Sequence, residues 1–192
     1  MAVLILPVAV IIALYSYELI LFWTQNPETA ERTHLLVSIL VSGTAINGLM
    51  NPPYALQLAF GWTRLSFFKT LIAVILVVPL IIYMTTHYGA VGAAVAWLVL
   101  NIGMFLLEIP IMHRRLLPAE KWRWYLEDVS LPLIVAFAAA WAGRYIAGGA
   151  TNQTMMIVHL GIVSAFTLGA VGIATPVSRT WLFAHVPDFR RA

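Results

Sequence analysis

The sequence predicts an all-α, polytopic membrane protein, a bundle of six transmembrane helices. Of its 192 residues, 61% are hydrophobic and only 10% are charged, whereas a soluble domain carries about 25% charged residues. The mean hydropathy is +0.89. The apolar residues fall into six runs of about 20 residues each, the length that a helix needs to cross about 30 Å of hydrocarbon.

The six predicted spans form one domain over residues 1–176, and residues 177–192 follow as a cytoplasmic amphipathic tail. The first span is not a secretory signal, because no basic segment precedes it, its apolar run is too long and no small-residue cleavage site closes it. The spans are Val3–Trp23, Leu35–Phe60, Ser66–Thr86, Ala90–Met112, Val129–Ala147 and Met155–Thr175.

The second span contains the run Asn51-Pro52-Pro53, which predicts a break in its helix. Proline lacks an amide hydrogen and disfavours helix in the residue before it. Within hydrocarbon, the freed backbone groups persist only where protein or a water-filled cavity meets them. We therefore expect this span to be kinked and to face an interior. Packing on neighbouring helices and a hinge or substrate-facing break both explain the motif.

The third and fourth spans are joined by only three residues, His87–Gly89. Gly89 suits such a tight turn, because glycine adopts positive φ at little cost. Small residues then repeat at four-residue spacing, as Gly89 with Ala93 and Gly92 with Ala96. This spacing lets a neighbouring backbone approach closely, so we expect tight packing at the start of the fourth span.

The distribution of Lys and Arg predicts that both termini are cytoplasmic. The first, third and fifth connections hold only Arg32 and Arg144, and the opposite side holds the other nine basic residues. Basic loops stay in the cytoplasm. The fourth connection, HRRLLPAEKWRWYLED, combines cations with aromatic rings. Such a segment suits the headgroup level, as a surface anchor or as a site for an anionic lipid headgroup.

Polar side chains within the spans are candidates for a substrate site. Polar groups in hydrocarbon are costly, so they indicate either interhelical contacts or a functional pathway. Asn47 and Asn101 each lie about 12 residues into a span, near the bilayer midplane. Glu108 could pair with one of four cytoplasmic cations: Arg64, Lys69, Arg114 or Arg115. Arg144 lies on the sparsely basic side, where snorkelling to the headgroups is the alternative to a binding role.

No catalytic constellation is present in the sequence. The five histidines are scattered, none has metal-ligand spacing, and there is no phosphate-binding glycine loop or cysteine. We therefore expect neither an enzyme nor a metal or cofactor site, and coupling to an H⁺ or Na⁺ gradient stays open. The excess of 11 basic over 8 acidic residues is too small to indicate nucleic acid as a partner.

The third and fourth spans resemble a known family. The stretch KTLIAVILVVPLIIYMTTHYGAVGAAVAWLVLN, residues 69–101, is similar to the Wzx-type polysaccharide flippases of the MATE/MOP exporter superfamily. The shared features are a helix that opens near Lys69, a tight turn at Tyr88-Gly89 and the Gly92-Ala93-Ala94 start of the next helix. The segments LPVAVIIALYSYELILFWT, NPPYALQLAFGWTRL and IPIMHRRLL also fit the C-terminal half of such proteins.

The resemblance implies one half of a twelve-helix transporter that moves undecaprenyl-pyrophosphate-linked oligosaccharide across the bacterial inner membrane by alternating access. Besides the glycan lipid and membrane lipids, the implied partners are a second six-helix half, as a separate chain or a second copy, and glycan assembly proteins. The implied substrate-binding residues are three cations for the anionic headgroup and three polar lining residues: Arg64, Lys69, Arg144, Asn47, Asn51 and Asn101. The alternative is a truncated remnant or a non-transporting scaffold subunit of a glycan-assembly complex.

Overall fold

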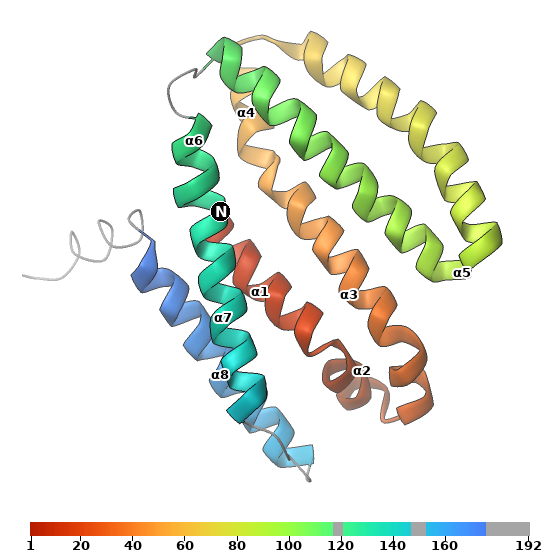
Figure 1. Ribbon diagram of the computed structural model, residues 1–192, viewed down its shortest axis with the longest axis vertical. Helices are drawn as coiled ribbons and strands as arrows, with labels where there is room; N and C mark the ends of the chain where they lie inside the picture. The colour runs from red at the N-terminus through yellow and green to blue at the C-terminus, as the bar shows by residue number, and fades with distance from the viewer. Residues whose placement is uncertain (117–120, 147–152, 176–192) are drawn as a thin grey trace, which may run out of the picture.

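The computed structural model describes residues 1–116, 121–146 and 153–175, and the regular structure in these ranges is helical without a strand (Figure 1). The predicted all-helical class is therefore confirmed, and the predicted tail lies outside the described residues. The elements are α1 (Ala2–Leu14), α2 (Ser16–Thr24), α3 (Pro27–Leu49), α4 (Asn51–Ala59), α5 (Thr63–Leu116), α6 (Lys121–Arg123), the π-helix η1 (Trp124–Ser130), α7 (Leu131–Ile146) and α8 (Gln153–Ala174).

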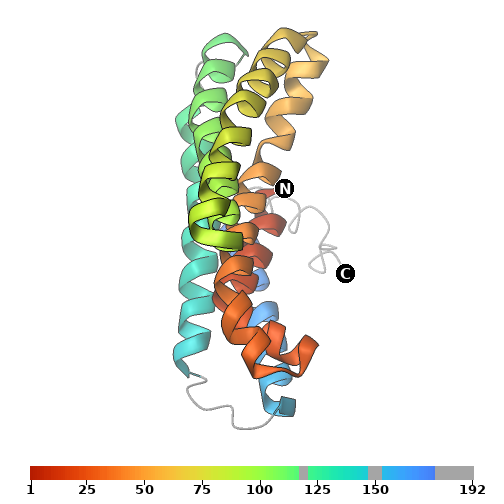
Figure 2. The same cartoon turned by 90° about the vertical axis from the view of Figure 1, so that its right-hand side faces the viewer.

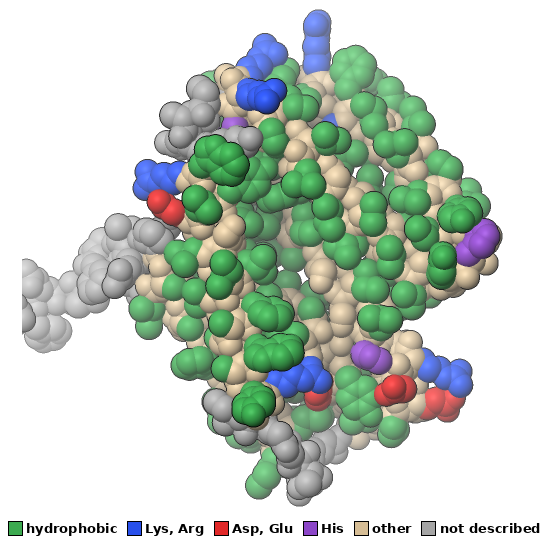
Figure 3. Space-filling model, in the orientation of Figure 1, with side chains coloured by type: hydrophobic (Ala, Val, Ile, Leu, Met, Phe, Trp, Pro, Cys, Tyr) green, Lys and Arg blue, Asp and Glu red, His purple; other side chains and the backbone are tan. Residues whose placement is uncertain are grey.

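The long helices lie in two layers. α7 and the second half of α5 form one layer, and α1, α3 and α8 form the other (Figures 1 and 2). The face that carries α7 is mostly hydrophobic, and its charged side chains gather near the ends and along one edge (Figure 3). This distribution is typical of a protein whose central band meets hydrocarbon.

Within the described residues, four helices are long and apolar enough to cross a membrane, or five if the bent pair α1–α2 is one span. The four are Pro27–Ala59, Thr63–Arg115, Trp124–Tyr145 and Thr154–Ala174. The first predicted span, Val3–Trp23, corresponds to α1 and α2, between which the chain bends by 73°. The six-span count stays a prediction, since α5 is a single element that covers two of the predicted spans.

Gly89 divides α5 into two arms, residues 63–88 and 90–116. Its φ of 62° and ψ of −147° are not helical, and the chain turns back at this point (Figure 1). A Cβ at Gly92 would overlap the backbone carbonyl of Met84, and Ala96 one turn later is fully buried. The predictions of a glycine turn and of close backbone packing after it are both confirmed.

The predicted break in the second span is also present. α3 ends at Leu49, and α4 begins at Asn51 with the two prolines in its first turn. Proline is tolerated there, because the first amides of a helix have no intrahelical partner. The start of α3 is capped by Asn26, whose side chain accepts hydrogen bonds from the amides of Glu28 and Thr29 at 2.9 and 3.2 Å.

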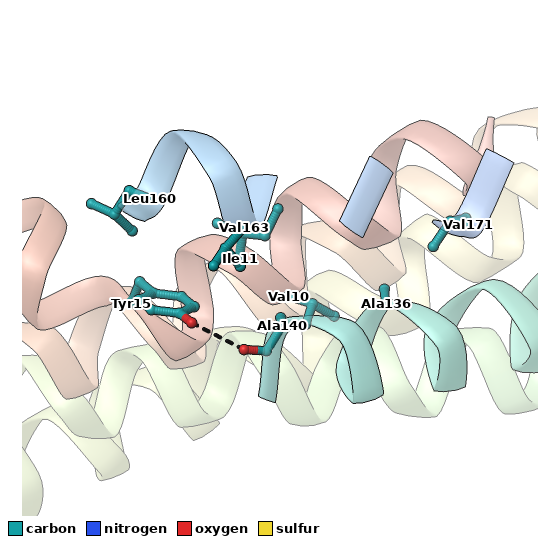
Figure 4. Close-up of a cluster of buried hydrophobic side chains, with 8 residues drawn as sticks. All are labelled: Val10, Ile11, Tyr15, Ala136, Ala140, Leu160, Val163 and Val171. Atoms are coloured by element: carbon teal, nitrogen blue, oxygen red, sulfur yellow. Dashed lines mark hydrogen bonds between the residues drawn. The ribbon is translucent and has the colours of Figure 1, made fainter. Parts of the chain in front are cut away.

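The main core lies where α1, α7 and α8 meet. Small residues of α7 let the other two helices approach, because Ala136 and Ala140 are fully buried and a Cβ at Gly143 would lie 2.6 Å from Val163. Figure 4 shows the hydroxyl of Tyr15, the residue between α1 and α2, pointing at the Ala140 carbonyl oxygen. The core residues are Val10, Ile11, Tyr15, Ala136, Ala140, Leu160, Val163 and Val171.

The two ends of the described bundle lie at one pole. Ala2 at the start of α1 and Thr175 after the end of α8 line the same small cavity, together with Trp124 of η1. The prediction that both termini are on one side of the membrane stays a prediction. The assignment of that side to the cytoplasm stays a prediction.

Substitution of Gly89 by Ala should lower the free energy of unfolding by about 1–3 kcal/mol, because its backbone conformation is essentially restricted to glycine. The matched control is Gly103→Ala, since Gly103 is helical and nothing lies near its missing Cβ. The control should raise the stability by about 0.5–1 kcal/mol. Unfolding in detergent micelles measures both, and equal effects would contradict the assigned turn.

Candidate functional site

The structure distributes the predicted site residues over separate polar clusters. Lys69 joins a buried network around Glu108, which we call the Glu108 cluster. Asn47 and Asn101 bond to each other as the asparagine pair. Arg144 lies at the bend between α1 and α2, which we call the Tyr15 junction. Arg64 and Asn51 lie outside all three, on the exposed surface.

The Glu108 cluster joins α4 to both arms of α5. Lys69 Nζ donates to Glu108 Oε2 at 2.8 Å, and Gln57 Nε2 donates to Oε1 at 2.8 Å. Ser66 Oγ donates in turn to Gln57 Oε1 at 3.1 Å. The Glu108 side chain is 1% exposed and that of Lys69 is 21% exposed. A nearly buried carboxylate thus has a donor at each oxygen.

The sequence predicted that Glu108 pairs with one of four cations, and the structure selects Lys69. It did not predict Gln57, although an amide side chain near the cytoplasmic end of the predicted second span was the available signal. Opposite charges in a medium of low dielectric stabilise each other only with good geometry and further hydrogen bonds. The Glu108 cluster meets both conditions, so Lys69 is engaged inside the protein and is not presented freely to an anionic ligand.

The asparagine pair joins α3 to the second arm of α5. Asn47 Nδ2 donates to Asn101 Oδ1 at 2.9 Å, and Asn101 Nδ2 donates to the Trp97 carbonyl at 2.8 Å. One turn earlier, Gly43 of α3 makes room for the Trp97 ring. Asn101 is buried and Asn47 is exposed. Of the two roles predicted for this depth, the structure shows an interhelical hydrogen bond, and Asn47 keeps a surface available for a second contact.

The Tyr15 junction is a helix break whose backbone groups find partners within the protein. The bend frees carbonyls at the end of α1, and Ser38 Oγ donates to the Ala13 carbonyl at 2.8 Å. Arg144 Nη1 donates to the Leu14 carbonyl. The Tyr15 hydroxyl donates to the Ala140 carbonyl of α7 at 3.0 Å. Two helices, α3 and α7, therefore hold the bend in place through three hydrogen bonds.

Arg144 has two further contacts at this junction. Its guanidinium lies 3.5 Å from Glu18 Oε1 and 5.7 Å from the centre of the Tyr15 ring. On the described part of the chain, the second oxygen of Glu18 and Nε2 of His159 are buried without a hydrogen-bond partner. The sequence left open whether Arg144 snorkels or binds a ligand. The structure shows a third role, because Arg144 caps a helix end.

The exposed cations gather at the turn between α4 and α5. Arg64 is exposed beside Phe67 and Phe68, and no ion pair involves it within the described ranges. The Arg115 guanidinium lies 4.4 Å from the centre of the Trp62 ring, which places it at the same turn. These two guanidinium groups form a cationic surface that can meet phosphate oxygens.

The clusters provide hydrogen-bonding and charged groups that could contact a ligand. No set of three or more His, Asp or Glu side chains within residues 1–116, 121–146 and 153–175 is placed to hold a metal ion. No protein-family model, curated protein or solved structure matches the chain. The resemblance to Wzx-type flippases stays a prediction, and function has to be argued from the geometry.

Replacing Lys69 by Met should lower the unfolding free energy by about 3–5 kcal/mol, because Glu108 would remain buried without a counter-ion. The double variant K69M/E108Q should recover most of this loss, since it removes both charges. Denaturant unfolding in micelles gives the comparison.

The exposed Arg64→Met variant serves as the control for that experiment and should change stability by less than about 0.5 kcal/mol. If K69M were as stable as R64M, the buried ion pair would not hold the arms of α5 together.

Replacing Arg144 by Met should cost about 1–3 kcal/mol, because the Leu14 carbonyl would lose its donor in an apolar setting. The control is Arg32→Met, whose pair with Glu28 is a solvent-exposed contact between successive helical turns and is worth about 0.5 kcal/mol or less. Denaturant unfolding in micelles measures both variants. Similar losses of unfolding free energy in the two variants would refute the capping role of Arg144.

Proposed function

We propose that this chain is one half of a transporter, and that it carries an undecaprenyl-pyrophosphate-linked oligosaccharide across the bacterial inner membrane by alternating access. The breaks in the helices near the N-terminus support the transporter class. The glycan lipid follows from the resemblance of residues 69–101 to Wzx-type flippases.

The observation that carries the proposal is that two helices in succession are discontinuous. α1 and α2 meet at a 73° bend, and α3 and α4 are separated at Met50. Discontinuous helices with polar groups at their breaks are typical of transporter binding sites, since irregular backbone is tolerated only where it is buried or faces a cavity. A passive anchor would have no need of either break.

The exposed guanidinium groups are the proposed first contact for the substrate. Arg64 and Arg115 lie at one pole, where an anionic pyrophosphate could approach from the headgroup level. Planar guanidinium groups bind phosphate oxygens in a bidentate manner. Asn47, which is exposed near the end of α3, and the exposed Asn51 would meet the glycan, and Asn101 supports Asn47. Lys69 and Arg144 would act indirectly, by fixing the helices that carry these groups.

A second six-helix half completes the proposed transporter. Two copies of one bundle inserted the same way up would be related by an axis along the membrane normal, as parallel transporter repeats are. A separate chain with the same number of spans would serve equally. In either arrangement, an H⁺ or Na⁺ gradient is the energy source to be tested.

A scaffold subunit of a glycan-assembly complex is the second candidate function, and one observation favours it. Four of the six predicted substrate residues bond within the protein and have structural roles, namely Asn47, Lys69, Asn101 and Arg144. A scaffold would tolerate the loss of Arg64 and Arg115, because neither holds a helix in place.

The test is export of lipid-linked glycan in a flippase-deficient bacterial strain, with the chain expressed alone or with the product of the reading frame upstream of its gene. We expect export to be restored in at least one of these arrangements. The double variant R64A/R115A should then lower export by about tenfold or more, since charged hydrogen bonds contribute about 1.5–3 kcal/mol each.

Arg32→Ala is the matched control, because Arg32 is an exposed cation beside Glu28 near the start of α3. It should leave export within about twofold of the unmodified chain, in line with the small worth of exposed pairs. Failure of export in both arrangements would rule out the flippase proposal. Restored export with an unaffected R64A/R115A variant would rule out the assigned headgroup contact.

A further inference from the structure

One exposed face of α3 is partly polar. α3 belongs to the layer of α1 and α8 (Figures 1 and 2), and its Ser42 and Leu49 line an apolar hollow toward α7 and the second arm of α5. At 3.6 residues per turn, Leu40 and Thr44 are on the other side of the helix, and both are exposed. We call four exposed residues on this side the α3 outer face, namely Leu40, Thr44, Asn47 and Asn51.

The asparagine pair indicates the depth of this face in the membrane. Asn101 lies two residues from the middle of the second arm of α5, residues 90–116, which is about 3 Å along a helix. Asn47 Nδ2 donates to Asn101 Oδ1 at 2.9 Å, so Asn47 lies at the same depth. Thr44 is less than one helical turn from Asn47. The centre of the α3 outer face is therefore near the bilayer midplane.

The polar side chains of the α3 outer face keep hydrogen-bonding groups free. Asn47 uses one amide hydrogen on Asn101 and has a second hydrogen and a carbonyl oxygen. Within residues 1–116, 121–146 and 153–175, neither the Thr44 hydroxyl nor the Asn51 amide forms a hydrogen bond. Acyl chains offer no hydrogen-bonding groups, and a polar group without a partner in hydrocarbon is costly. Lipid tails alone are thus a poor cover for this face.

The spacing of the α3 outer face is that of two helices packed in parallel. Its residues are separated by four, three and four positions, which is the a and d pattern of a heptad. Beside it, Ala45 and Gly48 line a hollow of about 490 Å³ between α1 and α3. Small residues let membrane helices approach closely, and Thr and Asn side chains form hydrogen bonds across such contacts. A second helix therefore suits both the shape and the chemistry of this face.

We propose that the α3 outer face binds the α3 outer face of a second copy of this chain. When two copies are inserted the same way up and related by an axis along the membrane normal, each residue meets its equivalent at its own depth. Asn and Thr side chains both donate and accept hydrogen bonds, so Asn47 and Thr44 each complement themselves. The four side chains are uncharged, so the two faces do not repel each other.

This inference rests on the proposed function only in taking the dimer as the complete transporter. In that transporter the contact closes the path, and the two α3 helices part when the glycan reaches Asn47 and Asn51. The contact itself needs no substrate. It can therefore be measured in membranes separately from export.

The experiment is disulfide cross-linking of the full chain in membranes, and the chain has no cysteine that would interfere. The variant T44C should form a covalent dimer on oxidation, since a disulfide requires two Cα atoms about 5.5–6 Å apart. The matched control is I75C, an exposed position at the middle of the first arm, residues 63–88. We expect the dimer fraction of T44C to be at least about fivefold that of I75C.

A second set of variants tests the hydrogen bonds across the contact. In the T44C background, N47L/N51L should lower the dimer fraction by about threefold or more, because each interhelical hydrogen bond contributes modestly. The variant N101L removes only the intramolecular partner of Asn47 and should keep the dimer fraction within about twofold. If N47L/N51L fails to fold, the comparison of T44C with I75C still decides.

Absence of cross-linking in T44C, or equal cross-linking in T44C and I75C, would overturn the proposal. Reaction of an uncross-linked T44C with a membrane-impermeant thiol reagent would overturn it in favour of a water-lined path. Cross-linked T44C in cells that show no restored export would support the dimer and rule out the flippase.

Discussion

The structure depends on one constraint, that a backbone carbonyl freed within hydrocarbon must find a donor inside the protein. The bend between α1 and α2 frees the carbonyls of Ala13 and Leu14, and Ser38 and Arg144 supply the donors. These donors come from α3 and α7, so the bend fixes the positions of both helices relative to α1. The Tyr15 hydroxyl adds a third link to α7. A local irregularity thereby organises four helices.

Features that arise from local chemistry could be predicted from the sequence. Gly89 predicted the turn within α5, the run after Met50 predicted the break between α3 and α4, and the equal depth of Asn47 and Asn101 predicted their shared role. Each follows from a residue type whose backbone or hydrogen-bonding preference is strong by itself. The sequence predicted which polar residues lie at which depth in the spans. It did not predict which of them pair with each other.

The rest depended on contacts between residues far apart in the chain. No proline or glycine marks the bend at Tyr15, whose hydroxyl bonds to a carbonyl 125 residues away. Arg144 caps a carbonyl 130 residues earlier, which no spacing pattern reveals. Four cations could have paired with Glu108. The register between the two arms of α5 places Lys69 next to its carboxylate. The π-helix η1 directly precedes the first turn of α7, which contains Pro132, and no residue pattern marks its wider helical turn.

The hairpin formed by the two arms of α5 has a consequence for how the chain enters the membrane during synthesis. Its first arm exposes apolar side chains around most of its surface, among them Phe67, Ile75 and Tyr83. Gly89 closes the hairpin at one end, and the pair of Lys69 and Glu108 ties it at the other. An ammonium or a carboxylate entering hydrocarbon alone is costly. If both arms enter the membrane together, the Lys69 ammonium and the Glu108 carboxylate neutralise each other. We therefore expect the two arms of α5 to insert as one hairpin.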